Sequence, residues 1–108
     1  MKNMRRIELI ETLKDILKRV VPNAQAILYG SEARGEARPD SDVDLLILLD
    51  KNEITLEEEE EITAPIYDME FEKGIVISPI VMTRKRWEEA KKQTLFYYNV
   101  LKDGILLQ

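Results

Sequence analysis

Two acidic residues and a glycine–serine pair stand out in this chain as candidates for a chemical role. Asp42 and Asp44 are separated by one residue at the start of an apolar run, so on a β-strand both carboxylates leave the same face, about 6–7 Å apart along the backbone. Two carboxylates on one rigid face suit an oxygen-seeking divalent cation such as Mg²⁺. Gly30 and Ser31 end an earlier apolar run, where a glycine lets backbone N–H groups approach an anion and a serine can cap a following helix. A phosphate-binding turn at Gly30-Ser31 next to a metal-binding pair at Asp42 and Asp44 predicts a nucleotide site.

A less specific interpretation exists for each of these positions. Asp42 could cap a turn, and Asp44 could be a solvated residue at the start of a strand. Between the two motifs, Arg34 could contact phosphate oxygens with its planar guanidinium, or be an exposed loop residue. Ser41 could contact the ligand near the metal, or stabilise the turn that precedes the strand. The Gly-Ser pair upstream of Asp-x-Asp, between two apolar runs, favours the nucleotide site.

Composition limits the remaining possibilities. The chain has 108 residues, of which 44% are hydrophobic and 34% charged, which is typical of a soluble globular protein and predicts a single domain over residues 1–108. Cysteine and histidine are absent, so thiol nucleophiles, histidine-based triads and thiolate or imidazole metal sites are excluded. A formal net charge of −5 argues against general nucleic-acid binding. We expect no membrane span and a cytoplasmic location.

Hydrophobic periodicity predicts helices that alternate with three strands. An amphipathic helix is expected over residues 4–20, with Ile7, Ile10, Leu13, Leu17 and Val20 on its apolar stripe. Strands are expected over 24–29, 42–50 and 75–82, the second buried on both faces because it lacks polar alternation. A helix begins at a capping box of Thr55 and Glu58 and ends at Gly74, with a kink or a break expected at Pro65. Two more helices are expected, from Thr83 to about Lys92 and over about 95–102, before an apolar tail. The fold class is therefore α+β, a small three-stranded sheet flanked by helices.

The residues that carry chemistry form a pattern known from one family. They are Gly30-Ser31, Ala33, Gly35 and the run Ser41-Asp42-Val43-Asp44-Leu45. This set resembles the signature of the minimal nucleotidyltransferases, the smallest branch of the polymerase-β-type nucleotidyltransferase superfamily. The resemblance implies a mixed sheet, and transfer of a nucleoside monophosphate from a nucleoside triphosphate, ATP being favoured, to an external acceptor.

Site residues and partners follow from the same resemblance. Asp42 and Asp44 would be the catalytic residues and would hold one or two Mg²⁺ ions, while the nucleotide would be bound by Gly30, Ser31, Arg34 and Ser41. The acceptor would come from outside the chain. A helical HEPN-type partner protein, as in toxin and antitoxin pairs, is the expected candidate, and the chain could also form an oligomer.

One departure from the family pattern leaves both an active enzyme and a non-catalytic protein open as functional predictions. Active members of the superfamily carry a third acid on a later strand, whereas the expected strand 75–82 contains no acid and Ser78 is its only polar side chain. Asp68 is the nearest upstream acid that could replace it. The first hypothesis is an active Mg²⁺-dependent nucleotidyltransferase. The alternative is a catalytically degenerate nucleotide-binding module that acts as antitoxin or scaffold for a partner, and a third is a structural subunit that binds no nucleotide.

Overall fold

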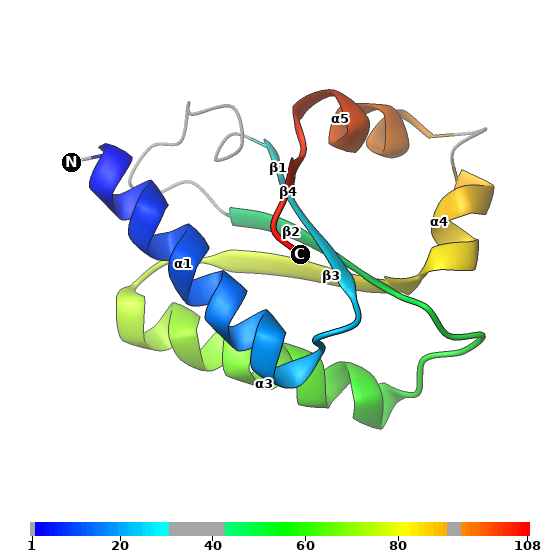
Figure 1. The fold of residues 1–108 in the computed structure, drawn as a ribbon, viewed down its shortest axis with the longest axis horizontal. Coiled ribbons are helices and arrows are strands. Elements are labelled where there is room, and N and C mark those ends of the chain that lie inside the picture. The colour runs from blue at the N-terminus through cyan, green and yellow to red at the C-terminus, as the bar shows by residue number, and fades with distance from the viewer. Residues whose placement is uncertain (1, 31–42, 91–93) are drawn as a thin grey trace.

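The protein is built on one mixed β-sheet (Figure 1). The computed structural model describes residues 2–30, 43–90 and 94–108. In these residues the strand order is β3-β2-β1-β4, formed by Ile77–Thr83, Val43–Leu49, Gln25–Tyr29 and Ile105–Leu106. β1 is antiparallel to β2 and β4, and β2 is parallel to β3. The predicted mixed sheet is confirmed, but the predicted number of three strands was one too low.

The fourth strand arises because the apolar tail returns to the sheet. Ile105 and Leu106 pair with Leu28 and Ile27, and the N–H of Leu107 donates to the carbonyl of Ala26 over 2.8 Å. An edge of a sheet offers unpaired backbone groups, which a short apolar segment can satisfy. Two paired residues are too few to give a strand pattern in the sequence.

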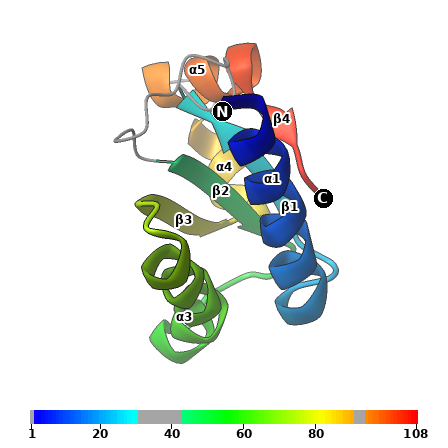
Figure 2. The same ribbon diagram turned by 90° about the vertical axis from the view of Figure 1, so that its left-hand side faces the viewer.

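Helices cover the two faces of the sheet (Figures 1 and 2). The helices α1, Lys2–Val20, and α3, Leu56–Lys73, pack together on one face. The helices α4, Arg84–Ala90, and α5, Leu95–Asp103, contact the other face through β2, β3 and β1. None of the helices among the described residues is long and apolar enough to cross a membrane.

The strand β2 separates two hydrophobic clusters. Side chains alternate across a strand, so Val43, Leu45, Ile47 and Leu49 join the cluster with α1 and α3, whereas Leu46 and Leu48 join the cluster with α4 and α5. Five consecutive residues from Leu45 to Leu49 are buried. The prediction of a doubly buried strand is confirmed.

The predicted helix boundaries are largely observed, because local capping determines them. Thr55 and Glu58 form the reciprocal capping box, and Gly74 ends α3 in the left-handed region at φ 66°. The hydroxyl of Thr83 accepts from the N–H of Arg86 at the start of α4 over 3.1 Å. The predicted end of this helix at Lys92 lies outside the described residues.

Two details of the predicted helices were wrong. Of the two alternatives predicted at Pro65, a kink or a break, the break is not observed, because α3 is one helix from Leu56 to Lys73. Burial of Ile62, Ile66 and Met69 on one side holds both halves to the same core. In α1 the buried stripe includes Leu9 and Ile16 besides Leu13 and Leu17, and Ile7 is exposed. Ile10 and Val20 of the predicted stripe also pack against this core, so the predicted stripe was wrong only at Ile7 and lacked Leu9 and Ile16.

Pro65 should cost stability where it stands. It lacks the N–H that would donate to the carbonyl of Glu61, so Pro65→Ala is expected to raise the free energy of unfolding by about 2 kcal/mol, less any entropy gained by the unfolded chain. Ala64→Gly, next to it on the same helix, should lower that free energy by about 1 kcal/mol. Urea titrations followed by circular dichroism measure both, and a lower stability of Pro65→Ala would contradict the expectation.

Candidate functional site

The predicted glycine and one predicted aspartate meet at the start of β2. Tyr29, the last residue of β1, is the register partner of Asp44, and Gly30 follows it with φ 76°. A Cβ placed on Gly30 would collide with a carboxylate oxygen of Asp44. This position requires glycine for two reasons, since its backbone is in the left-handed region and the Asp44 side chain occupies the space a methyl group would need. The two motifs therefore form one site.

A cavity of about 470 Å³ opens beside this pair. One wall is formed by Tyr29, Gly30 and Asp44 at the ends of the strands, and the other by α5. The side chains that α5 contributes are Phe96, Asn99, Lys102 and Asp103. The volume of this cavity lies in the range of small-molecule sites, about 300–1,000 Å³.

The residues of α5 were not predicted as site residues. Lys102 and Asp103 lie three and four positions after Asn99, so all three side chains share one side of the helix. This spacing was visible in the sequence, but it does not tell which part of the sheet the helix covers. Val100 of the same helix is buried in the cluster that contains Leu46 and Leu48, and the helix packed in this way contributes its polar side to the cavity beside Asp44.

An aromatic cluster supports the floor of the cavity. The rings of Tyr29 and Phe96 meet edge to face with centroids 5.4 Å apart, and Phe96 meets Trp87 in the same way at 5.9 Å. Burial, and secondly the negative charge of Asp44, raise the pKa of Tyr29 to about 12. The phenol is therefore neutral at physiological pH, and it can donate a hydrogen bond in the site but cannot serve as a base there.

The position next to Asp44 on the other side is occupied by serine. Ser78 of β3 is the register partner of Asp44, and parallel neighbours in register project from the same face of the sheet. No residue of β3 is acidic. Asp68 does not take this place, because it lies on the exposed side of α3 and lines a depression against α1, on the face of the sheet opposite Asp44.

Four predicted site residues lie outside the described residues. They are Ser31, Arg34, Ser41 and Asp42. Among residues 2–30, 43–90 and 94–108, no group of three or more acidic side chains could hold a metal ion. Of the predicted metal pair, only Asp44 is therefore placed.

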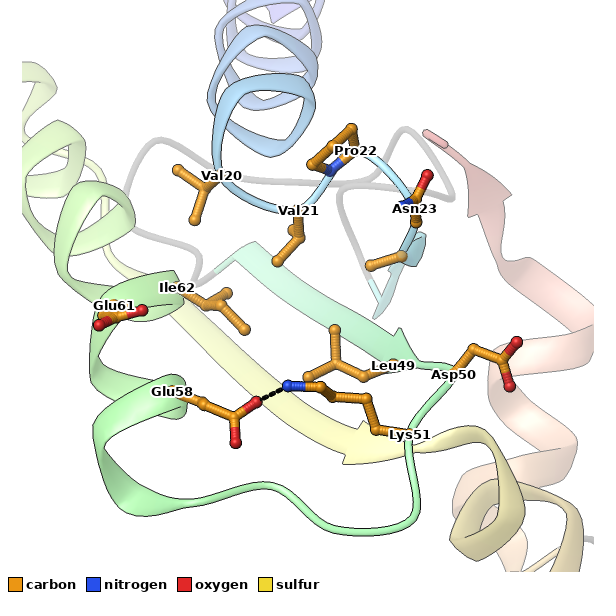
Figure 3. Close-up of a pocket in the computed structure, with 11 residues that line it drawn as sticks. Val20, Val21, Pro22, Asn23, Leu49, Asp50, Lys51, Glu58, Glu61 and Ile62 are labelled. Atoms are coloured by element: carbon orange, nitrogen blue, oxygen red, sulfur yellow. Dashed lines mark hydrogen bonds and ion pairs between the residues drawn. The ribbon is translucent and has the colours of Figure 1, made fainter.

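A second cavity, of about 490 Å³, lies at the opposite end of β2 (Figure 3). It is bordered by the end of α1, by Leu49 and by the start of α3, and Lys51 pairs with Glu58 across it. No predicted site residue lines it. The cavity beside Asp44 is therefore the one that the candidate chemistry points to.

Comparison with solved structures shows which proteins share this fold. A chain of a crystal structure of a toxin–antitoxin with AMP-PNP superposes with a TM-score of 0.65 at 16% identity, over 92% of this chain and 72% of that one. A protein of Sulfolobus solfataricus described as a candidate nucleotidyltransferase superposes with a TM-score of 0.60 at 19% identity, over 97% of this chain and 84% of that one. Both likenesses show a shared fold.

Comparison of the sequence with protein-family models identifies the family. A search of curated proteins found no match. The family model described as "Nucleotidyltransferase domain" matches residues 10–103, which include both Gly30-Ser31 and Asp42-x-Asp44. The chain therefore belongs to the nucleotidyltransferase domain family.

Proposed function

We propose that this protein is a Mg²⁺-dependent nucleotidyltransferase that transfers a nucleoside monophosphate, AMP by preference, to an acceptor outside the chain. The observation that carries the proposal is the contact of the Asp44 carboxylate with Gly30 at the mouth of a cavity. In such a transfer an acceptor oxygen bonds to the α-phosphorus, the bond from this phosphorus to the bridging oxygen breaks, and pyrophosphate leaves. The protein contributes chiefly by positioning the reactants and stabilising charge.

The residues of the cavity have separate tasks in this proposal. Gly30 and Ser31 hold the triphosphate through backbone N–H groups and the Ser31 hydroxyl, with Arg34 and Ser41 as further contacts. Lys102 lies in the wall that faces Gly30 and supplies a positive charge for the phosphates. The Tyr29 hydroxyl stays protonated and donates a hydrogen bond.

The carboxylate oxygens of Asp44 and Asp42 are suitable ligands for a magnesium ion. Carboxylate oxygens are the ligands that Mg²⁺ prefers. Asp44, together with Asp42 two positions before it, would hold the ion on the side of the strand that faces the cavity. When bound, Mg²⁺ supplies positive charge that stabilises the leaving pyrophosphate.

The nucleotide and the acceptor are proposed from different observations. The toxin–antitoxin structure that shares the fold contains AMP-PNP, which supports an adenine nucleotide as substrate. The same structure is a toxin–antitoxin complex, which supports a partner protein as acceptor, and a helical HEPN-type protein is the candidate from the sequence resemblance. A cytoplasmic location fits this role.

One observation favours a second candidate function. Ser78, in register with Asp44, stands where an acid would activate the acceptor hydroxyl, and a neutral hydroxyl is a poor base. The alternative is a degenerate nucleotide-binding module that acts as antitoxin or scaffold for a partner protein. It predicts binding of ATP and of the partner without transfer.

Replacement of Asp44 tests the proposed catalytic role. Asp44→Asn should lower the rate of AMP transfer by about 100-fold or more, because loss of several kcal/mol of charge stabilisation corresponds to at least this factor. Transfer is measured with labelled ATP, Mg²⁺ and a HEPN-type partner. Asp50→Asn, at the exposed opposite end of β2, is the matched control and should leave the rate unchanged. Equal rates in both variants would refute the assignment.

Alanine substitutions at Gly30 and Gly74 distinguish the effect of backbone strain from an effect on the nucleotide site. Gly30 and Gly74 both have positive φ, but a Cβ would collide with Asp44 only at Gly30 and meets nothing within 4 Å at Gly74. Alanine at either position should lower the free energy of unfolding by about 1–2 kcal/mol. Only Gly30→Ala should also weaken Mg²⁺–ATP binding, by about tenfold or more, as measured by calorimetry. If both variants bind ATP equally well, Gly30 does not form the nucleotide site.

Ser78 separates the two candidate functions. If the missing acid limits turnover, Ser78→Asp should raise the rate of AMP transfer by about 100-fold, within the usual contribution of a general base. Ser78→Asn has a similar shape without the charge and should leave the rate as it is. An active wild-type protein whose rate Ser78→Asp does not raise would count against the degenerate module.

A further inference from the structure

The outward side of α3 carries a continuous ridge of exposed residues. Leu56, Glu60, Ala64, Tyr67 and Phe71 follow one another at spacings of four, four, three and four, and all five are exposed. Such spacings place side chains above one another on one side of a helix. The side chains of Leu56, Tyr67 and Phe71 are 71%, 50% and 91% exposed. We call these five residues the α3 ridge, which extends over about 22 Å of helix axis.

This ridge lies away from the core and away from the candidate site. The opposite side of α3 buries Ile62, Ile66 and Met69, and α3 forms the outer border of the molecule in both views (Figures 1 and 2). Asp44 lies on the other face of the sheet. An exposed phenylalanine and tyrosine one turn apart on a folded surface are typical of a protein-binding site.

A row of carboxylates runs along one flank of the ridge. Its members, spaced by four, seven and four residues, are all exposed: Glu57, Glu61, Asp68 and Glu72. We call them the acidic row. No lysine or arginine occurs between Leu56 and Glu72, so α3 itself contributes only negative charge to this flank. Arg19 of α1 and Lys73 lie beside Asp68 and Glu72 in the depression against α1, so the flank is most negative at its Glu57 end. A ridge that is apolar except at Glu60, beside a row of carboxylates, matches an amphipathic helix with apolar residues at spacings of three and four and with Lys or Arg beside them.

The charges also argue against a second copy of this chain as the occupant. The chain has a formal net charge of −5, and Glu60 lies within the ridge itself. Two α3 ridges packed on each other would bring carboxylates together in a contact that excludes water, which is unfavourable. The outward side of α5 also exposes Leu95, Tyr98 and Leu101. Lys102 and Asp103, which follow Leu101 on α5, have opposite charges and therefore favour neither a basic nor an acidic partner. The exposed side of α5 therefore serves as the control surface.

We propose that the α3 ridge and the acidic row bind a basic amphipathic helix of a partner protein. The inference does not rest on nucleotide transfer, because the surface is on the far side of the sheet from Asp44. The aromatic side chains supply the apolar contact, and the acidic row orients the incoming helix. A partner bound here leaves the cavity beside Asp44 open.

Two designed peptides test the proposal on the full-length protein. Each is a helix of about 18 residues with leucines at spacings of three and four, one flanked by lysines and its twin by glutamates. Fluorescence anisotropy at low salt should show binding of the lysine peptide, and at least tenfold weaker binding of the glutamate twin. Amide shifts in NMR spectra should centre on residues 56–72.

Variants identify which residues are responsible. Tyr67→Ser with Phe71→Ser should weaken binding of the lysine peptide at least tenfold, while Leu95→Ser with Tyr98→Ser on α5 should leave it unchanged. Neutral amides in place of the acidic row should remove most of the salt dependence. Calorimetry with Mg²⁺–ATP on the same samples should be unaffected, so that failure of the nucleotide site is seen separately.

Several results would overturn the proposal. These are absence of binding, equal binding of both peptides, shifts centred on α5, or equal loss of affinity in the α5 variant. Self-association of the wild-type chain that Phe71→Ser abolishes, seen by analytical ultracentrifugation, would assign the ridge to a second copy instead.

Discussion

The burial of β2 on both faces fixes the register of the sheet and, with it, the place of the candidate site. Five consecutive residues of this strand are buried, alternately against α1 and α3 and against α4 and α5. A slip of one residue would exchange the two sets and move the Asp44 carboxylate into the apolar core under α1 and α3. Because an unpaired charge in such a core is very costly, the register is fixed. The same packing that stabilises the sheet therefore places Asp44 beside Gly30.

The end of the chain completes the site through backbone pairing. Ile105 pairs with Leu28, and the N–H of Ala26 donates to the carbonyl of Gln108 over 3.2 Å. With β4 held against β1, the preceding helix α5 contacts β1, and its Val100 is buried in the cluster with Leu46 and Leu48 of β2. A segment without recognisable chemistry of its own thus provides the second wall of the cavity. Loss of this pairing would open the site without removing any predicted site residue.

The two surfaces with the clearest chemistry lie on opposite faces of the sheet. Beside Asp44 the groups suit an anionic nucleotide and a cation, and β3 places a serine next to Asp44 without an acid that could serve as a base. On α3 the groups suit an apolar, basic helix. The separation follows from the layered architecture, in which each face of the sheet carries its own helices. A nucleotide and a partner protein could therefore be bound at the same time.

Features that depend on neighbouring residues could be predicted from the sequence alone. The Thr55–Glu58 capping box, the end of α3 at Gly74 and the buried core of β2 are local in origin, since each needs only nearby side chains or a run of apolar residues. The Gly-Ser and Asp-x-Asp motifs indicated the family for the same reason. Features that depend on distant segments became visible only in the folded chain. Packing keeps α3 one helix through Pro65, returns the tail to the sheet as β4, and brings Asn99, Lys102 and Asp103 to the cavity beside Asp44. These outcomes follow from packing between segments far apart in the chain, which no local pattern encodes.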